Sequence, residues 1–444
     1  MKKFWIDSLI ATLFVFGVLW SLKQVAQFNV FNVFDPIGKA LGDMEITDIA
    51  FSKLRLEQPP VDNDITIINM STLTRGEFAQ QLAYIASLKP RVIGIDSFFD
   101  CAGCAGGAID SLCCPMAYDT LANMSLGFAI SNAGNVVMVT KLLQSDSLLE
   151  AAGDIDLYDS LEHTDEMIRG NVFEGFANLD TDANDQEDLK ICRRFNPSIM
   201  MVDGTRELAF SVKIAMLYDS AKTKRFLERN KSSEVINYRG NVPDVFHASD
   251  PQFANRYAYL DWDQAMDSST FLTELIKDRI VLFGFMGQTM EDTSWDDKFI
   301  TPLNKDYAGK TRPDMYGVVV HANIISMILG EDYINELSPW QEYVIAFLVC
   351  LLNVALFIMI TRKIPLWFDG LSIILQLVQI LICTVLMLYF LKWFNFKLNL
   401  TLTLAALALV GTCFELYNGF IREILKRIKN SRLFTKKKKE VLNS

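Results

Sequence analysis

The amino-acid sequence predicts a three-layer α/β domain with a mostly parallel sheet, together with four transmembrane α-helices, one N-terminal and three C-terminal. Two observations lead to this fold class. The 444-residue chain is 51% hydrophobic and 21% charged, and its apolar residues are concentrated near its two ends. Between the ends, short apolar runs alternate with helical patterns, which is typical of a sheet covered by helices. We therefore expect an anchor at 1–23, an extracytoplasmic α/β domain at 24–338, three transmembrane helices at 339–420 and a basic cytoplasmic tail at 421–444.

The first apolar stretch covers residues 4–22 and follows two lysines. A helix of roughly 20 apolar residues crosses a hydrocarbon core of about 30 Å. A cleaved signal peptide is the alternative. However, the apolar run is longer than a usual signal-peptide core, and no small-residue cleavage site follows it. A retained N-terminal anchor is therefore the favoured interpretation.

The middle region opens with a βαβ unit. The run ITIIN at Ile65–Asn69 and the run at 92–95 are predicted strands, and residues 75–88 between them have helical periodicity. Two strands joined in this way should be parallel, with a right-handed crossover. A strand at 280–283 is uniformly apolar and should be central in the sheet. Further helices are expected near 117–132, 207–219, 269–277 and 318–329, and further strands at 136–140 and 235–238.

Three more apolar stretches follow, at about 343–360, 371–391 and 398–419. The breaks between them are short, so neighbouring helices should form antiparallel hairpins. Three acidic residues lie in or beside the spans: Asp7, Asp369 and Glu415. Each is near a predicted cytoplasmic end, so contact with headgroups or with a basic neighbour is favoured over a proton or ion path.

Basic residues predict the orientation. Lys2 and Lys3 precede the first span, and residues 422–439 carry nine Lys or Arg against one acid. By the positive-inside rule both termini should be cytoplasmic. The chain would then be a multi-pass membrane protein with its main domain outside the cytoplasm. The basic tail is expected to contact acidic lipids or to dock a cytoplasmic partner.

The region 24–338 is strongly acidic. It contains 26 Lys and Arg against 47 Asp and Glu, which gives a formal charge of −21. Such a domain is not expected to bind nucleic acid or an anionic lipid surface through bulk charge. Its charge is consistent with solubility.

Four cysteines, Cys101, Cys104, Cys113 and Cys114, lie within the segment CAGCAGGAIDSLCC. Thiols outside the cytoplasm tend to oxidise, and an insertion rich in Gly and Ala has little core of its own. We therefore expect structural disulfides. A redox-active C-x-x-C pair and a zinc site are the alternatives. The other cysteines, at 192, 350, 383 and 413, are expected to stay out of disulfides.

An acidic run places oxygen-bearing side chains at alternate positions, among them Asp180, Asp182 and Asn184. Calcium-binding loops use this spacing. The sixth position of the run is Asp185 instead of Gly, and the twelfth is Ile191 instead of Glu. A solvated acidic loop is therefore favoured over a calcium site.

A ligand pocket, if present, should lie beyond the carboxyl ends of the parallel strands. Gly284 and Gly287 follow one predicted strand and Asp96 ends another, so the candidate lining is Asp96, Gly284, Gly287, Asp292 and His321. His321 also lies near a helix start, where a hydrogen bond to a carboxylate is favoured over a carboxylate–histidine metal site.

The order of motifs resembles the second type of the CHASE family, an extracellular sensory domain of bacterial signalling proteins. The matching stretches, within about residues 30–335, are ITIINMS, RVIGIDSFF, GFANLDTD with a later RRF, INYRGN, DRIVLFGFMG, TPL and YGVVVHANIISMIL. Three trailing transmembrane helices are also typical of that family. The sequence departs from it in the Cys-rich insertion and in residues 180–193, which replace a shorter D-x-D-G-x-x-R turn. A ligand role for that turn is therefore not carried over.

The resemblance implies a sensor in the bacterial inner membrane with its main domain in the periplasm. Family members usually signal to an attached cytoplasmic kinase or cyclase. No such domain is recognised in this sequence, so we expect signalling to a separate protein partner, with a small-molecule ligand of unknown identity and with self-association as an open question. The alternatives are a structural or assembly subunit of an envelope complex and a thiol oxidoreductase using Cys101 and Cys104. Three histidines and no nucleophile–base spacing argue against hydrolytic catalysis, so we expect no catalytic residues, cofactor or enzyme activity.

Overall fold

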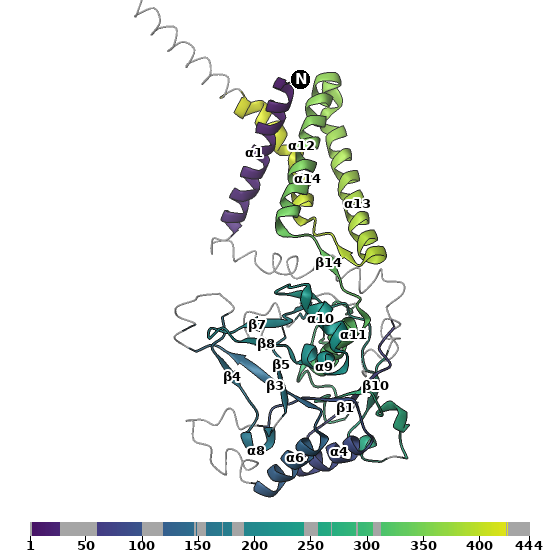
Figure 1. Cartoon of the computed structure of the whole chain (residues 1–444). Helices are drawn as coiled ribbons and strands as arrows, with labels where there is room; N and C mark the ends of the chain where they lie inside the picture. Colours follow the sequence, from purple (N-terminus) through teal and green to yellow (C-terminus); the bar gives the residue numbers. More distant parts are fainter. Residues whose placement is uncertain are drawn as a thin grey trace, which may run out of the picture. The chain divides into compact units, whose positions relative to one another are not determined.

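The computed structural model (Figure 1) divides into two compact units. One unit contains Met1–Ile46 with Asn335–Ser444, and the other contains Thr47–Ile334. The structure describes residues 2–26, 60–99, 119–145, 148, 157–170, 172–179, 191–243, 256–267, 269–289, 292–304, 312–422 and 424.

The second unit is built on a seven-stranded sheet. Its central strands are β1 (Ile65–Asn69), β11 (Ile280–Gly284) and β2 (Val92–Asp96). β11 lies between β1 and β2, and all three strands are parallel. The apolar run at 280–283 is therefore central, as predicted. The sheet continues with β10 (Ala258–Leu260) beside β1, and with β3 (Val136–Leu143), β4 (Ser160–Glu162) and β5 (Phe173–Phe176) beyond β2.

Only the pairing of β3 with β4 is antiparallel in this sheet. Every other pairing within it is parallel. The prediction of a mostly parallel sheet with helices is thereby confirmed, and the antiparallel strand makes the sheet mixed. Parallel strands of this kind are buried on both faces, which is why the central strands consist largely of apolar residues.

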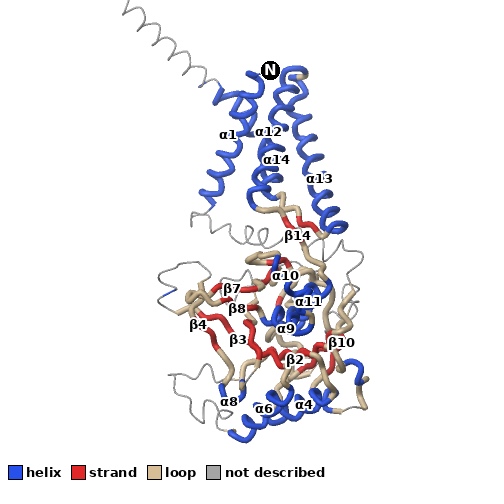
Figure 2. The backbone as a smooth tube through the Cα atoms, in the orientation of Figure 1, coloured by secondary structure: helices blue, strands red, loops and turns tan. Residues whose placement is uncertain are grey.

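Helices pack against the sheet (Figure 2). Helices α4 (Arg75–Ser87) and α6 (Thr120–Ala133) share a core with alternate strand residues, including Ile68, Ile93 and Phe283. The intervening strand positions meet α9 (Phe210–Tyr218) and α11 (Gly317–Gly330): a Cβ on Gly94 would lie 2.5 Å from Ile214 Cδ1. Because successive side chains of a strand point to opposite faces of the sheet, one set packs against α4 and α6 and the other against α9 and α11.

The helix ends follow from local sequence. Thr74 and Glu77 form a reciprocal capping box at the start of α4, which satisfies backbone donors that have no partner within the helix. Gly134 ends α6 in the left-handed region, at φ 69°, where glycine carries no steric penalty. The predicted helices at 75–88, 117–132 and 318–329 therefore appear with ends shifted by a few residues at most.

Two predicted elements are wrong. The segment 269–277 contains only a 3-10 turn, Thr273–Leu275, because just Ile276 and Phe271 reach the core. The strand predicted at 235–238 shortens to β9 (Glu234–Val235), because the next side chains bond to other parts of the unit. The remaining short elements are α8 (Glu166–Arg169), β6 (Arg194–Phe195), β7 (Ser198–Met200), β8 (Arg206–Leu208), α10 (Ser220–Glu228), the 3-10 turn Gln264–Met266, β12 (Lys298–Phe299) and β13 (Met315–Tyr316).

The first unit contains four helices that are long and apolar enough to cross a membrane, judged by length and composition over the described residues. They are α1 (Lys2–Ala26), α12 (Pro339–Lys363), α13 (Phe368–Phe394) and α14 (Thr401–Leu416). Shorter elements are β14 (Asn335–Glu336), the 3-10 turn Pro365–Trp367, β15 (Phe396–Lys397) and a π-helical turn, Tyr417–Ile421. The four helices cover the four apolar stretches predicted from the sequence.

Helices α1, α12 and α14 share a core that includes Val15, Val354 and Val410. Helix α13 packs on α14, where Gln376 Nε2 donates a hydrogen bond to the Leu407 carbonyl at 2.7 Å. A Cβ on Gly411 would lie 2.8 Å from Gln376 Oε1. Gly411 therefore leaves room for the Gln376 side chain where the two helices meet.

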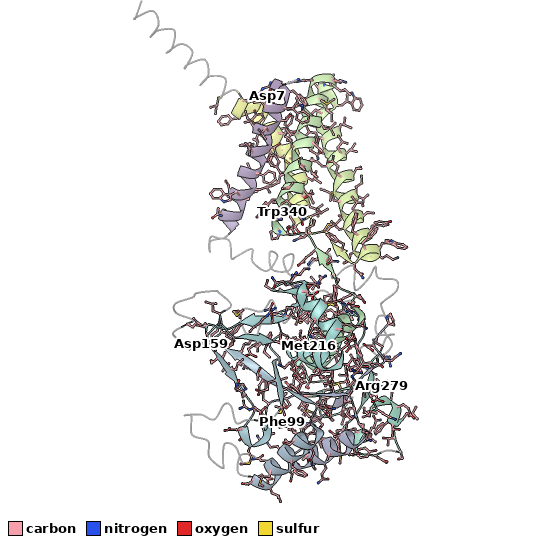
Figure 3. The ribbon with its side chains drawn as sticks, viewed as in Figure 1. Asp7, Phe99, Asp159, Met216, Arg279 and Trp340 are labelled. Carbon is pink, nitrogen blue, oxygen red and sulfur yellow. The ribbon has the colours of Figure 1, made fainter. Side chains whose placement is uncertain are left out.

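The acidic residues in or beside the spans lie as follows. Asp7 Oδ2 is 3.5 Å from Arg422 Nη2, and Figure 3 shows Asp7 near one end of α1. Asp369 and Glu415 are exposed. Asp7 thus contacts a basic neighbour, which is the arrangement that the sequence favoured.

Candidate functional site

Three central strands end side by side at the carboxyl edge of the sheet. Asn69 of β1 is in register with Gly284 of β11, and Gly284 is in register with Asp96 of β2. The loops that follow these residues therefore leave the sheet at one place. Ligands of open α/β sheets bind at this edge.

The first turn of α11 packs tightly against this edge. A Cβ added to Gly284 would lie 2.5 Å from Val318 Cβ and under 3 Å from both methyl groups of that residue. Glycine at the end of β11 therefore lets the helix start approach the strand. The sequence suggested Gly284 as part of a ligand-pocket lining, whereas in the structure the start of α11 lies against it.

Asp96 and His321 lie together on the face covered by α9 and α11. Asp96 Oδ2 is 4.0 Å from His321 Nε2, which is too long for a hydrogen bond. His321 Nδ1 is instead 3.4 Å from the Ser211 hydroxyl, and the ring meets Phe210 edge-on at 5.2 Å. The histidine is therefore held mainly by packing, and not by the carboxylate bond that the sequence favoured.

Burial controls the charges of this pair. The pKa of Asp96 is raised well above its ordinary value, first by burial and then by the negative charge of Asp297. Burial lowers the pKa of His321 to about 3. The imidazole is consequently neutral at physiological pH, and it cannot form an ion pair with Asp96 there.

Gly287 and Asp292 belong to a separate turn. Gly287 has φ +89°, and a Cβ on it would lie 2.5 Å from Asp292 Cβ. Asp292 accepts hydrogen bonds from the backbone N–H groups of Gln288 and Ser294, and these bonds lower its pKa. Asn69 ties the turn to the sheet by accepting from the Met286 N–H at 2.9 Å. Asp292 therefore stabilises a loop.

A cavity of about 220 Å³ does lie at the carboxyl edge. Its lining comes from the residues just after the three strands and from the start of α4: Met70, Ser71, Leu73, Arg75, Ser97, Phe98, Phe99 and Phe285. Phe99, labelled in Figure 3, stacks on Phe78 with ring centroids 5.6 Å apart. None of the five predicted lining residues borders the cavity, but Ser97 and Phe285 directly follow two of them.

One charged side chain, that of Arg75, is found in the described part of the cavity lining. It is the only charged residue among the eight described residues of the lining, and 6% of its surface is exposed. Arg75 Nη1 donates a hydrogen bond to Asn123 Oδ1 at 2.8 Å, so α6 helps to hold it. The cavity therefore combines a positioned cation with aromatic walls and two serines.

A buried polar contact that the sequence did not predict is centred on Asn323. Asn323, fully buried on α11, accepts from the N–H groups of Arg239 and Gly240 at 2.9 and 3.2 Å. Its amide donates to the carbonyls of Gly240 and Val319, both at 2.9 Å. The INYRGN segment is thereby fastened to α11. The signal was present as an Asn within an otherwise apolar helix.

The other candidate residues fall outside the described residues. These are the cysteines at 101, 104, 113 and 114, and the acidic run with Asp180, Asp182 and Asn184. None of the four described cysteines, at 192, 350, 383 and 413, forms a disulfide. Over the described residues, no group of three His, Cys, Asp or Glu side chains is placed to hold a metal ion.

Comparisons with known proteins add the family. No curated protein and no solved structure matches the chain significantly. The sequence profile of the CHASE2 domain matches residues 14–357, which is more than three quarters of the chain. The chain therefore belongs to the CHASE2 family of extracellular sensory domains.

Proposed function

We propose that this protein is a membrane-anchored sensor that binds a small anionic molecule in the carboxyl-edge cavity and passes a change of state to a separate protein partner. The observation that carries the proposal is a cavity with one buried cation at the edge where parallel sheets bind ligands, in a chain of a sensory family. The proposal includes no catalytic role for the chain.

The cavity favours a particular chemistry. The Arg75 guanidinium suits a carboxylate or phosphate, while Phe98, Phe99 and Phe285 suit an apolar body. A volume of about 220 Å³ is below the ~300–1,000 Å³ typical of drug-sized ligands. The occupant is therefore a small molecule, with a phenyl-substituted carboxylate as a reasonable probe.

Signalling requires that the ligand bind two conformations unequally. Helix α4 carries Arg75 at its first residue, and the loop after β11 carries Phe285. A ligand that draws these two elements together would favour a closed state. We propose that such closure is the event that the membrane helices transmit.

Filling the cavity should abolish ligand stabilisation. Full-length protein in nanodiscs is heated with and without millimolar phenylacetate, and unfolding is followed by tryptophan fluorescence. A ligand at 100 times its Kd stabilises the folded state by about 2.7 kcal/mol, so the wild type should melt several degrees higher. Ser97→Trp should show no shift, whereas Ser232→Trp, at an exposed position, should behave like the wild type.

Two results would count against the cavity. Equal stabilisation of Ser97→Trp would place the ligand elsewhere. No stabilisation of the wild type by phenylacetate, benzoate or small phosphates would remove the proposed ligand class. Co-purification from membranes then identifies the output: a kinase or cyclase supports sensing, whereas envelope machinery supports the scaffolding alternative.

The proposal also includes a placement for the chain. We expect a three-layer periplasmic domain, an inner membrane crossed four times and two cytoplasmic termini. The four apolar helices and the basic residues beside them support this arrangement. Protease added to intact spheroplasts should digest residues 24–338 and spare epitope tags at both ends. Cleavage of the C-terminal tag with protection of the domain would reverse the orientation.

A further inference from the structure

The outer side of helices α4 and α6 has an exposed apolar surface. The two helices lie side by side (Figure 1), and a groove of about 690 Å³ runs between them. Leu121 and Phe128 of α6 line this groove with 78 and 69% of their surface exposed, and Met124 on the same helix is 59% exposed. Three neighbouring large apolar side chains this exposed mark an interaction site.

Over the residues that the structure describes, this surface is nearly uncharged, although the region 24–338 has a formal charge of −21. Asp119 is the only charged residue among the fourteen described residues that line the groove. It lies at the helix end, where its carboxylate accepts from the Ala122 N–H at 3.0 Å. Glu77, at the start of α4, is likewise occupied by the Thr74 cap. Two acidic copies would repel each other least if they met here.

The surface also carries both parts of a self-complementary contact. Its projections are Leu121 and Phe128. Its recess is lined largely by small side chains, including Gly76, Ala83 and Ala129. A two-fold interface uses the same patch on both partners, so each copy must offer a projection and a recess together.

We propose that the α4–α6 surface is the interface between two copies of this chain, with Phe128 of each copy seated in the groove of the other. The occupant is a second copy because the patch is neutral within an acidic domain and has matching projections and recess. This inference does not depend on the ligand proposed above, since the carboxyl-edge cavity has a different lining.

Association of two tagged copies tests the proposal. Full-length chains with different C-terminal tags are co-expressed, solubilised in mild detergent and captured through one tag. Wild type should bring down the second copy. Phe128→Glu places a charge in the interface, and Phe128→Ala removes the projection, so each should lower recovery about tenfold or more.

Met200→Glu is the matched control. Met200 is 58% exposed on β7, so the same change there should leave recovery unaltered. All variants should melt within a degree or two of the wild type, since position 128 is exposed. Failure of tagged wild type to capture the second copy would overturn the proposal, as would capture that survives Phe128→Glu. A monomeric protein whose melting temperature falls in Phe128→Ala would also overturn it, since residues of the same chain would then cover the groove.

Discussion

Replacement of Asn323 by leucine is expected to destabilise the α/β unit by about 3–9 kcal/mol, because leucine fills the space but makes no hydrogen bond. Two buried N–H groups, those of Arg239 and Gly240, lose their acceptor, and the Gly240 carbonyl loses a donor. Each buried polar group left without a partner costs about 1–3 kcal/mol. The segment that Asn323 fastens to α11 would then separate from the helix.

Thermal unfolding of full-length protein in nanodiscs measures this effect. We expect the apparent melting temperature to fall by roughly 10 °C, at about 2–4 °C for each kcal/mol. Ser326→Ala is the matched control, since Ser326 is buried on the same helix and pairs with the Tyr257 hydroxyl at 3.1 Å. It removes one bond and should cost about 1 kcal/mol. Equal losses for the two variants would show that the Asn323 bonds do not hold the segment.

The position of the central strand could be predicted from the sequence, because that position depends on burial alone. The run IVLFG is apolar throughout, and it lies at the centre of the sheet because both of its faces are covered. The helices at 75–88 and 318–329 were predicted for a related reason, since their apolar positions face the sheet. Local patterns contain this information because burial acts on each residue separately.

The cavity was predictable only as a region. The rule for carboxyl ends points to the edge where the cavity lies, yet the cavity is lined by Ser97 and Phe285 instead of Asp96 and Gly284. Which of two successive residues faces a cavity depends on how each loop leaves its strand. The role of Gly284 depends on Val318, 34 positions later in the chain, and no local pattern shows that contact.

The hydrogen bonds of Asn323 are even harder to predict from local sequence. Asn323 bonds to residues 83 and 84 positions earlier in the chain. Residue type shows that such a side chain needs partners when buried, but not where they are. The length of strand β9 was overestimated for this reason. After Val235 the chain is held by side-chain hydrogen bonds from Asn237 and Tyr238 to distant groups instead of by pairing with a neighbouring strand.

The second large effect concerns Asp96, whose replacement by asparagine should stabilise the protein at neutral pH. Burial and the charge of Asp297 raise the pKa of Asp96 well above its unfolded value near 4. The folded state therefore binds a proton that the unfolded state has released, so wild-type stability falls as pH rises from about 4 through the folded pKa. Each unit between the two pKa values corresponds to about 1.4 kcal/mol.

Asparagine has nearly the shape of the protonated acid and does not ionise. The Asp96→Asn variant should therefore match the wild type near pH 4 and melt increasingly above it up to pH 8, with the gap levelling off once the pH exceeds the folded pKa. Melting curves at half-unit pH steps in nanodiscs measure this gap. His321 is neutral in the folded state over this pH range. In the unfolded state it loses its proton near pH 6.5. This contribution to the pH dependence of stability is the same in the wild type and in the variant, so it cancels in the gap.

Asp203→Asn supplies a control of opposite sign. Hydrogen bonds from Thr205 lower the pKa of Asp203, so its contribution is present above pH 4 and is lost as pH falls. That variant should melt slightly below the wild type at pH 7 and converge with it in acid. If Asp96→Asn behaved in the same way as Asp203→Asn, the Asp96 carboxylate would be a stabilised anion. The buried carboxyl at the end of β2 would then need a cationic partner, and its neighbourhood would become a candidate cation site.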